Sequence, residues 1–188
     1  LSSRIVGREE LGALAPYLSH HLMGGSFCAA EGKANPLRAA TCFAEAARRH
    51  GARICTHTAL ESLSSDSHGF NLATSAGPIA ARRVVNCAGA EAQRIARMAG
   101  LELAVEGLPI QVNVTEAVEP LVTHLIYSAG ERLTLKQTRH GGLIIVGGWP
   151  ARAGPSGRPE VEPANIAPNL RAATAMVPVL AGVHLLRT

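Results

Sequence analysis

The chain has 188 residues, which is enough for one domain or parts of two and for a sizeable core. Hydrophobic residues make up 47% of it and charged residues 17%, a balance that excludes a disordered chain. The net charge of +4 comes almost wholly from arginines spread along the sequence, since Lys33 and Lys136 are the only lysines. Aromatic residues are few, so the basic stripe with interleaved aromatics that is typical of nucleic-acid binding is absent. We expect no nucleic-acid partner.

Cysteines and histidines give little support for a metal site. No CxxC or HExxH occurs, and the His20–His21 pair stands alone. The cysteines lie inside apolar segments, as small buried thiols do in a reducing compartment, and we expect a cytoplasmic protein. No apolar run has the length of a membrane span, and no secretory signal is visible. The chain starts at Leu1 instead of Met, which leaves a processed or cloned-away start open. The four cysteines are Cys28, Cys42, Cys55 and Cys87.

The first predicted elements are helices. Residues 9–18 are expected to form a short helix stopped by Pro16, followed by a loop at Gly24–Gly25. The strongest pattern is a helix over 36–50, with Asn35 as N-cap, proline at its first position and Gly51 as terminator.

Strand patterns follow this helix. The segments 52–58, 70–74 and 79–87 read as strands, with a turn at 64–69 and another at 77–78. A helix is expected from about Glu91.

The second half of the chain has mainly antiparallel β patterns. Alternation over 109–115 predicts a strand, and residues 133–139 and 143–148 predict a hairpin around 140–142. Residues 152–168 read as a loop or linker, and an amphipathic helix is expected from about Asn169 to before Pro178. The predicted fold class is therefore mixed α+β, and the sequence has no internal repeat.

The stretch RRVVNCAGAEAQRIARMAG, residues 82–100, joins a β-branched strand to a helix through small residues. The turn at Ala88–Gly89 leaves room for a flat ring or a backbone to approach, although a plain tight turn explains the glycine equally well. None of the 19 glycines is separated from another by a single residue, and no Walker loop is present. A dinucleotide therefore has no phosphate loop of the usual kind within this chain, which disfavours a nicotinamide enzyme.

Four blocks occur in the order found in one flavoprotein family: GKANPLRAATCFAEAARRHGARICTHTALESL, RRVVNCAGAEAQRIARMAG, LTLKQTRHGGLIIVGGWPA and NLRAATAMVPVLAGVHLLRT. They resemble FAD-dependent oxidoreductases of the D-amino-acid oxidase superfamily, above all the sarcosine oxidase beta-subunit-like and glycine or D-amino-acid oxidase-like members. The resemblance implies part of a FAD-binding domain over 1–100 and a substrate-domain sheet with its following helix over 101–188. It also implies an internal fragment, since the family's phosphate loop precedes these blocks and a further flavin-binding block follows them.

The resemblance implies cofactor contacts at four positions. Leu60 stands where relatives contact adenine through the backbone, and Cys87, Ala88 and Gly89 match a turn that passes near the flavin. Glu91 departs from the aromatic residue that relatives often have after this turn. The cofactor implied is FAD, which we expect the 188-residue fragment itself to bind weakly or not at all.

Candidate substrate-binding residues lie in the second half. Tyr127 and Trp149 are candidates for lining an apolar pocket, and core packing explains each equally well. Arg132 and Arg139 are candidates for binding a substrate carboxylate, with a solvated hairpin charge as the alternative. Lys136, on a predicted strand, is a further candidate, although it does not align convincingly with the lysine that some relatives place near the flavin. An exposed strand lysine is the alternative.

The implied function is oxidation of an amine or amino-acid C–N bond to an imine with hydride transfer to flavin. No Ser/His/Asp or Cys/His arrangement is evident, and no catalytic residue is assigned. The fragment itself is expected to be inactive. The alternative is a non-catalytic interaction module or a component of a larger assembly, with a partner subunit or a second copy covering its apolar surfaces. Sarcosine, proline, a D-amino acid and an opine-type compound are all compatible as small-molecule substrates.

Overall fold

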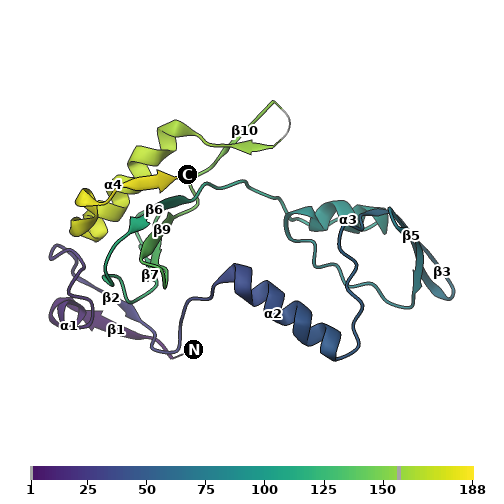
Figure 1. Ribbon diagram of the computed structural model, residues 1–188, viewed down its shortest axis with the longest axis horizontal. Coiled ribbons are helices and arrows are strands. Elements are labelled where there is room, and N and C mark those ends of the chain that lie inside the picture. Colours follow the sequence, from purple (N-terminus) through teal and green to yellow (C-terminus); the bar gives the residue numbers. More distant parts are fainter. Residues whose placement is uncertain (1, 156–157) are drawn as a thin grey trace. The chain divides into compact units, whose positions relative to one another are not determined.

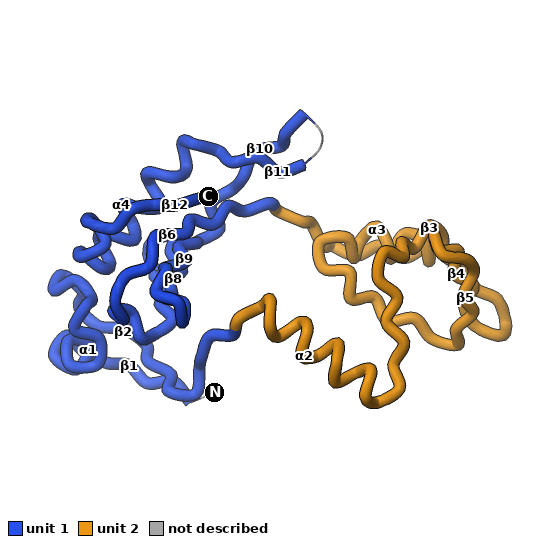
Figure 2. The backbone as a smooth tube through the Cα atoms, viewed as in Figure 1, with its two compact units in different colours: residues 1–34, 109–188 blue, residues 35–108 orange. Residues whose placement is uncertain are grey.

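The computed structural model describes residues 2–155 and 158–188. The chain forms two compact units: unit 1 contains residues 1–34 and 109–188, and unit 2 contains residues 35–108 (Figure 2). Each unit has both helices and strands, and the strand pairs of the described residues are antiparallel. This confirms the predicted mixed α+β class. The assignment of residues 1–100 to a FAD-binding part and 101–188 to a substrate domain stays a prediction, while the compact units group residues 1–34 with the second half of the chain.

Unit 1 is built on a five-stranded sheet with the order β12-β6-β9-β8-β7. The predicted hairpin is confirmed, because β8 and β9 pair with Gln137 opposite Leu143 around a turn in which Gly141 has a φ of 89°. The strand predicted over 109–115 was placed too early, since it begins at Asn113 and, among residues 109–112, only Ile110 forms a bridge, with Pro150. The strands are β6 (Asn113–Ala117), β7 (Ile126–Tyr127), β8 (Thr134–Gln137), β9 (Gly142–Val146) and β12 (Leu185–Arg187).

Helix α4 (Ile166–Met176) covers one face of this sheet (Figure 1). Side chains along β8 and β9 alternate between the two faces of the sheet, so every second one points toward the helix. These side chains form the core of unit 1. The 3-10 turn η3 (Pro178–Gly182) closes this core after the helix. The buried members are Val122, Ile126, Leu133, Leu135, Leu143, Ile145, Ala173, Val177 and Leu180.

The helix predicted from Asn169 begins three residues earlier, at Ile166. Pro168 is tolerated there because the first turn of a helix has no internal partner for its N–H groups. The preceding segment, predicted as a loop, contains a short pairing of β10 (Arg152–Ala153) with β11 (Pro159–Glu160) and a 3-10 turn η2 (Pro163–Asn165). Residues 156 and 157 of that segment lie outside the described residues.

The N-terminal part of unit 1 contains a pairing that the sequence did not indicate. Strand β1 (Arg4–Gly7) pairs with β2 (Gly24–Phe27), so the loop predicted at Gly24–Gly25 is wrong. Between them, α1 (Arg8–Leu14) begins one residue before the predicted start and ends before Pro16 instead of at Leu18. A proline disfavours helical geometry in the residue before it, which explains the early end.

Unit 2 opens with α2 (Pro36–Arg49), as predicted (Figure 1). The Asn35 side chain accepts a hydrogen bond from the Leu37 N–H at 3.1 Å, which caps the helix, and Gly51 follows its end with a φ of 84°.

A three-stranded sheet with the order β3-β4-β5 follows, formed by β3 (Leu60–Asp66), β4 (Gly69–Thr74) and β5 (Gly77–Ala81). The strand predicted over 70–74 is confirmed. The strand predicted over 52–58 is wrong, because the strand in this region is β3, which starts at Leu60. Strand β3 extends into the turn predicted over 64–69. The Asp66 side chain closes the turn that follows by accepting a hydrogen bond from the His68 N–H at 2.7 Å. The strand predicted over 79–87 ends at Ala81, and residues 82–88 have no strand partner among the described residues.

Candidate functional site

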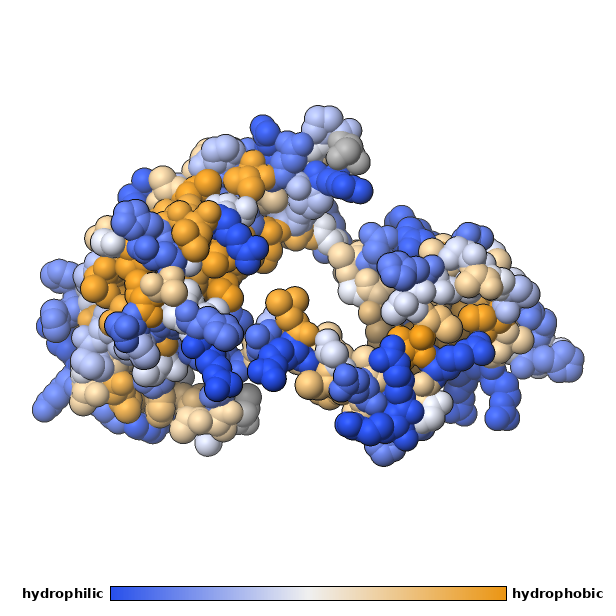
Figure 3. Space-filling model, viewed as in Figure 1, coloured by the Kyte–Doolittle hydropathy of each residue, from blue (hydrophilic) through white to orange (hydrophobic). Residues whose placement is uncertain are grey.

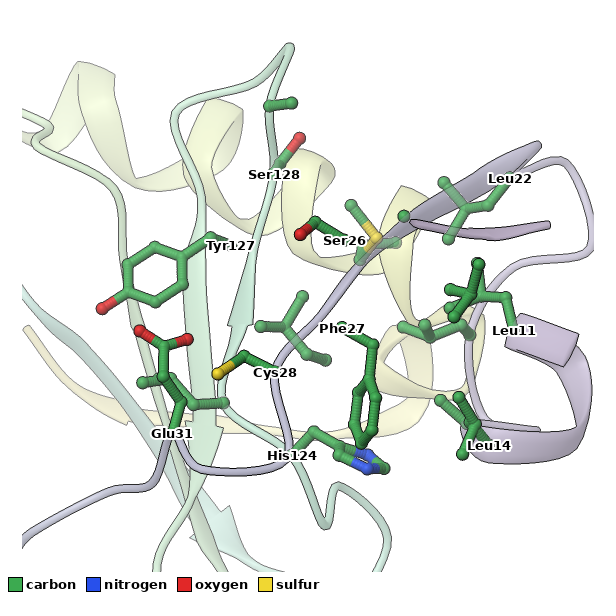
Figure 4. Close-up of a pocket in the computed structure, with 18 of the residues that line it drawn as sticks. Leu11, Leu14, Leu22, Ser26, Phe27, Cys28, Glu31, His124, Tyr127 and Ser128 are labelled. Atoms are coloured by element: carbon green, nitrogen blue, oxygen red, sulfur yellow. The ribbon is translucent and has the colours of Figure 1, made fainter. Parts of the chain in front are cut away.

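A cavity of about 850 Å³ lies within unit 1, between the β1–β2 pair with α1 on one side and the segment 123–130 on the other (Figure 4). Its wall is largely apolar, as is usual for small-molecule sites. The apolar side chains of the lining are half-buried and include Leu11, Leu14, Leu18, Leu22 and Met176.

Polar groups gather at one end of this cavity. Figure 4 places Tyr127, Glu31 and Cys28 together at that end, and the apolar leucines of α1 at the other. Ser26 and Ser128 add hydroxyl groups to the lining. An apolar wall with a few polar groups at one end suits a small organic molecule that carries polar substituents.

The wall formed by residues 123–125 is held by an aromatic cluster. The Tyr17 hydroxyl lies 2.6 Å from His124 Nδ1 and accepts a hydrogen bond from the His124 backbone N–H at 3.3 Å. The Phe27 ring meets His124 edge-on with ring centres 5.9 Å apart, and the Arg4 guanidinium lies over Phe27. Through these contacts, Tyr17 after α1 and Phe27 of β2 hold the segment before β7.

A second cavity, of about 640 Å³, lies beside the first in unit 1 and has Lys33 in its lining as well. The buried Gln137 side chain organises its wall. Its oxygen accepts from the backbone N–H groups of Leu121 and Val122, and its nitrogen donates to three backbone carbonyls. A satisfied buried amide of this kind fixes the segment 118–122 against the end of β8.

The sheet face opposite α4 carries two rows of side chains defined by strand register. Tyr127 is paired with Thr134, and Thr134 with Val146. Lys136 is paired with Ile144, and Ile144 with Val114. Side chains of paired residues point to the same face, so Tyr127 and Lys136, two of the predicted substrate residues, share this face of the sheet.

The other predicted substrate residues lie elsewhere in unit 1. Arg139 lines the second cavity. Arg132 and Trp149 are neighbours, since the Trp149 indole donates to the Arg132 backbone oxygen at 2.7 Å. That bond uses the backbone of Arg132 and leaves its exposed guanidinium outside the contact. The structure therefore places Arg132 next to Trp149. It places Tyr127 on the same sheet face as Lys136.

The predicted cofactor residues lie in unit 2. Leu60 opens β3 opposite Thr74, and Cys87 to Gly89 form an exposed turn before the 3-10 turn η1 (Gly89–Glu91) and α3 (Ala92–Met98). The Asn86 side chain holds this turn, accepting from the Ala88 N–H at 3.2 Å and donating to the Ala92 carbonyl at 2.8 Å.

This turn fits one contact with a flat ring. Gly89 has a φ of 55°, and a Cβ built on it would meet nothing within 4 Å, so its surface is open. No part of the 188-residue sequence supplies the paired glycines that hold a pyrophosphate. The residues present therefore fit a side contact with FAD and do not fit its phosphate cradle.

Two charged groups in unit 1, Lys33 and Glu116, have a lowered pKa. Partial burial, and then the charge of Lys136, lower the pKa of Lys33. Hydrogen bonds from the His184 backbone and ring hold the pKa of the Glu116 carboxyl below its ordinary value. Among the described residues, no group of histidine, cysteine or carboxylate side chains has the geometry of a metal site.

Comparison with known proteins identifies the family. The family model described as FAD dependent oxidoreductase matches residues 1–188. The chain belongs to this FAD-dependent oxidoreductase family. It is 32% identical over 124 residues to an opine oxidase subunit of Agrobacterium tumefaciens, which covers 66% of this chain and 32% of that protein. It is 25% identical over 172 residues to the beta subunit of the sarcosine oxidase of an Arthrobacter species, which covers 91% of this chain and 42% of that protein.

Solved structures of the family have the same fold. L-proline dehydrogenase from P. horikoshii superposes with a TM-score of 0.84 at 25% identity, over 98% of this chain and 50% of the other. Glycine oxidase from Geobacillus kaustophilus gives a TM-score of 0.79 at 23% identity, over 99% of this chain and 49% of the other. The chain thus spans between 32% and 50% of the length of these relatives. In the part of the chain that the structure describes, no helix is long and apolar enough to cross a membrane.

The cavity wall between the β1–β2 pair and residues 123–130 was not predicted from the sequence. Among its residues, Lys33 could have been singled out from the sequence, because it is one of two lysines in the chain. Tyr17, His124, Cys28 and Glu31 could not, since their importance comes from a strand pairing and a tertiary contact that have no local pattern.

Proposed function

We propose that this chain is part of a FAD-dependent oxidoreductase that oxidises the C–N bond of an amine or amino acid to an imine. The observation that carries the proposal is the family match over the whole chain, together with relatives named as subunits of opine oxidase and sarcosine oxidase. FAD, when bound, accepts the hydride equivalent. The residues of this chain bind and orient the substrate and contact one part of the cofactor.

In this proposal the cavity of unit 1 holds the substrate. Its apolar leucines exclude water, and Tyr127 with Glu31 supplies polar contacts at one end. Tyr17 positions the wall through His124 and does not itself belong to the reacting end. The open sheet face carrying Tyr127 and Lys136 is then the wall of the substrate domain.

The surface of unit 2 supports the view that it packs against further polypeptide in the whole protein. Its buried apolar residues are Leu63 and Ala96 alone, a very small core for residues 35–108. Large apolar side chains on α2 stay exposed, with Leu37 at 83% and Phe43 at 78%, and hydrophobic residues reach the surface of this unit in Figure 3. Val85, after the end of β5, is 82% exposed.

A second candidate function is that of a non-catalytic module or component within a larger oxidase. The curated relatives are named as subunits, which supports a partner subunit for this protein as well. A second copy of the chain is the other candidate partner. All four cysteines are free, which is typical of a reducing compartment and supports a cytoplasmic protein. The expectation that they are buried is wrong, because Cys42, Cys55 and Cys87 are exposed and Cys28 is half-buried.

A substitution in the turn at Cys87–Gly89 tests the proposed cofactor contact. In the whole protein, Ala88→Leu adds bulk at an exposed position without changing backbone strain, and Ala99→Leu makes the same change at an exposed position after α3. If the turn contacts the flavin ring, Ala88→Leu weakens FAD binding about tenfold or more, because overpacking costs roughly 1–3 kcal/mol. Ala99→Leu leaves FAD binding unchanged. Equal FAD affinity in the two variants, measured by flavin fluorescence titration of the apoprotein, contradicts the contact.

A further inference from the structure

The larger cavity of unit 1 lies between two strand edges that are unpaired among the described residues. All of β2 and both residues of β7 line this cavity, whereas β1 contributes only Val6 and β8 contributes none of the described lining residues. In the described chain, β2 pairs only with β1 and β7 only with β8. The free edges of β2 and β7 therefore both face the cavity. An unpaired strand edge presents N–H and C=O groups to which another strand can bond.

The hydrogen bonds between β7 and β8 show which backbone groups of β7 face the cavity. The Ser128 N–H donates to the Leu133 carbonyl at 3.1 Å, so these two opposite residues form a hydrogen-bonded pair. Bonded and non-bonded pairs alternate along antiparallel strands, so the backbone of the next pair, Tyr127 and Thr134, points away from the partner strand. The Tyr127 N–H and C=O therefore point toward the cavity, and no described residue bonds to them there. This arrangement suits the addition of a strand.

The two ends of the cavity differ in chemistry, as the two faces of a half-buried strand do. Figure 4 places the leucines of α1 at one end and Tyr127, Glu31 and Cys28 at the other. Successive side chains of a strand point to opposite faces, so a strand between these ends turns apolar residues to the leucines and polar residues to Tyr127. The first two residues of β2, Gly24 and Gly25, are glycines, and glycine in a strand often marks the close approach of another backbone.

The size of the cavity and the position of the chain ends indicate which segment lies there. A volume of about 850 Å³ is near the upper end of the range of about 300–1,000 Å³ for pockets that hold drug-sized ligands, and an amine or amino acid is much smaller. The relatives compared above contain further polypeptide, since this chain spans at most 50% of their length. Ser3 lines the cavity, whereas Thr188 is bonded to Asn113 of β6, near the opposite edge of the sheet. Polypeptide that precedes residue 1 therefore starts closer to the cavity.

We propose that in the whole protein a β-strand from the polypeptide preceding residue 1 inserts between β2 and β7 and pairs with both. The inserted strand joins the β1–β2 pair to the five-stranded sheet and fills the cavity from the leucines to the polar end. Its side chains alternate between apolar residues on the leucine side and polar residues beside Tyr127 and Glu31. Those polar residues complete the wall of the substrate site, a step that rests on the proposed function, whereas the strand pairing does not.

Hydrogen exchange of single amides in the whole FAD-loaded protein tests the pairing. The Tyr127 amide is expected to exchange about as slowly as that of Ile145, a buried residue of the inner strand β9. It is expected to exchange about a hundredfold or more slowly than the amide of His140, in the exposed turn between β8 and β9. A Tyr127 amide that exchanges as fast as that of His140 overturns the inference.

Photo-crosslinking of the whole protein identifies the segment that lies against the two edges. Benzoylphenylalanine replaces Ser26 of β2 or Tyr127 of β7, and Leu186, exposed on β12 at the opposite edge of the sheet, is the control position. Ser26 and Tyr127 are expected to crosslink to one segment before residue 1, in which apolar and polar residues alternate, and Leu186 is not. Adducts confined to residues 1–188, to residues after 188 or to a second copy overturn the inference. Neither measurement needs turnover, so the strand can fail while amine oxidation holds, and the reverse.

Discussion

Asn113 on β6 and Asn169 on α4 meet in the interior of unit 1, where Asn113 Nδ2 donates to Asn169 Oδ1 at 2.8 Å. Both residues are at most 1% exposed. Asn169 also donates to the Val146 carbonyl at 3.1 Å, and Asn113 accepts from the Thr188 hydroxyl at 2.7 Å. The pair thus ties the covering helix to β6 and β9 and to Thr188, which follows β12.

Asn169→Ala is expected to lower the free energy of unfolding by about 1–3 kcal/mol, because it leaves a buried donor and a buried carbonyl without partners. Asn165→Ala, at an exposed amide just before α4 that donates to the Pro150 carbonyl, is the control and should cost less. Urea denaturation of both variants checks this. Equal losses in the two variants contradict the role of the buried pair.

Gly147 and Gly148 give a matched pair of glycine substitutions. Both have positive φ, 149° and 73°, but a Cβ on Gly147 would overlap the backbone carbonyl of Arg132, whereas one on Gly148 would meet nothing within 4 Å. Gly148→Ala is expected to cost about 1–2 kcal/mol for the left-handed backbone alone. Gly147→Ala is expected to cost more than that, about 3 kcal/mol or above, because β8 must move away from β9.

The measurement is the unfolding midpoint of each glycine variant, together with the fluorescence of Trp149, whose indole donates to the same Arg132 carbonyl. A shifted Trp149 emission is expected for Gly147→Ala and not for Gly148→Ala. A loss of stability of the same size in both variants would show that the close approach to Arg132 does not matter.

Much of unit 1 and α2 could be predicted because the pattern is local. Alternation along β8 and β9 and the cap at Asn35 are carried by adjacent residues, and both were confirmed. The pairing of β1 with β2 could not be predicted, because its four-residue strands are mostly exposed and their partners lie about 20 residues apart. The strand predicted over 52–58, and the part of the 79–87 prediction beyond Ala81, have β-branched residues but no partner strand among the described residues, and a strand without a partner does not form.

The site was predicted only in part for a related reason. Tyr127 was chosen as an aromatic residue in the second half, and it does line the larger cavity. The opposite wall comes from residues 3–33, which were assigned to a different part of the chain. Arg132 and Trp149 form a pair away from this lining, and whether they bind substrate stays a prediction.

Glu116 predicts a pH dependence of stability. The His184 backbone N–H donates to its carboxylate at 2.8 Å and the ring Nδ1 lies 2.7 Å away, and these contacts lower the pKa of Glu116 from 4.5. A lowered carboxyl pKa stabilises the fold at pH values above the ordinary carboxyl pKa. This contribution to stability is lost as the pH falls from about 4.5 through the folded-state pKa. The difference in unfolding free energy between the parent and Glu116→Gln should therefore become smaller as the pH falls below about 4.5.

His184→Ala provides the companion variant for this measurement. It removes the ring contact and keeps the backbone N–H, so the acid-dependent difference should become smaller and should not vanish. A parent and a Glu116→Gln variant whose stabilities run parallel from neutral pH to pH 3 (about the limit for carboxyl titration) would rule out the contribution of these hydrogen bonds.

The most direct measurement for the whole account is anaerobic mixing of the complete gene product, loaded with FAD, with a panel of amines and amino acids. The account predicts that at least one of them bleaches the visible band of the oxidised flavin and yields one equivalent of a carbonyl compound, since water hydrolyses the imine. Flavin that dithionite reduces but that every amine and amino acid leaves oxidised would contradict it.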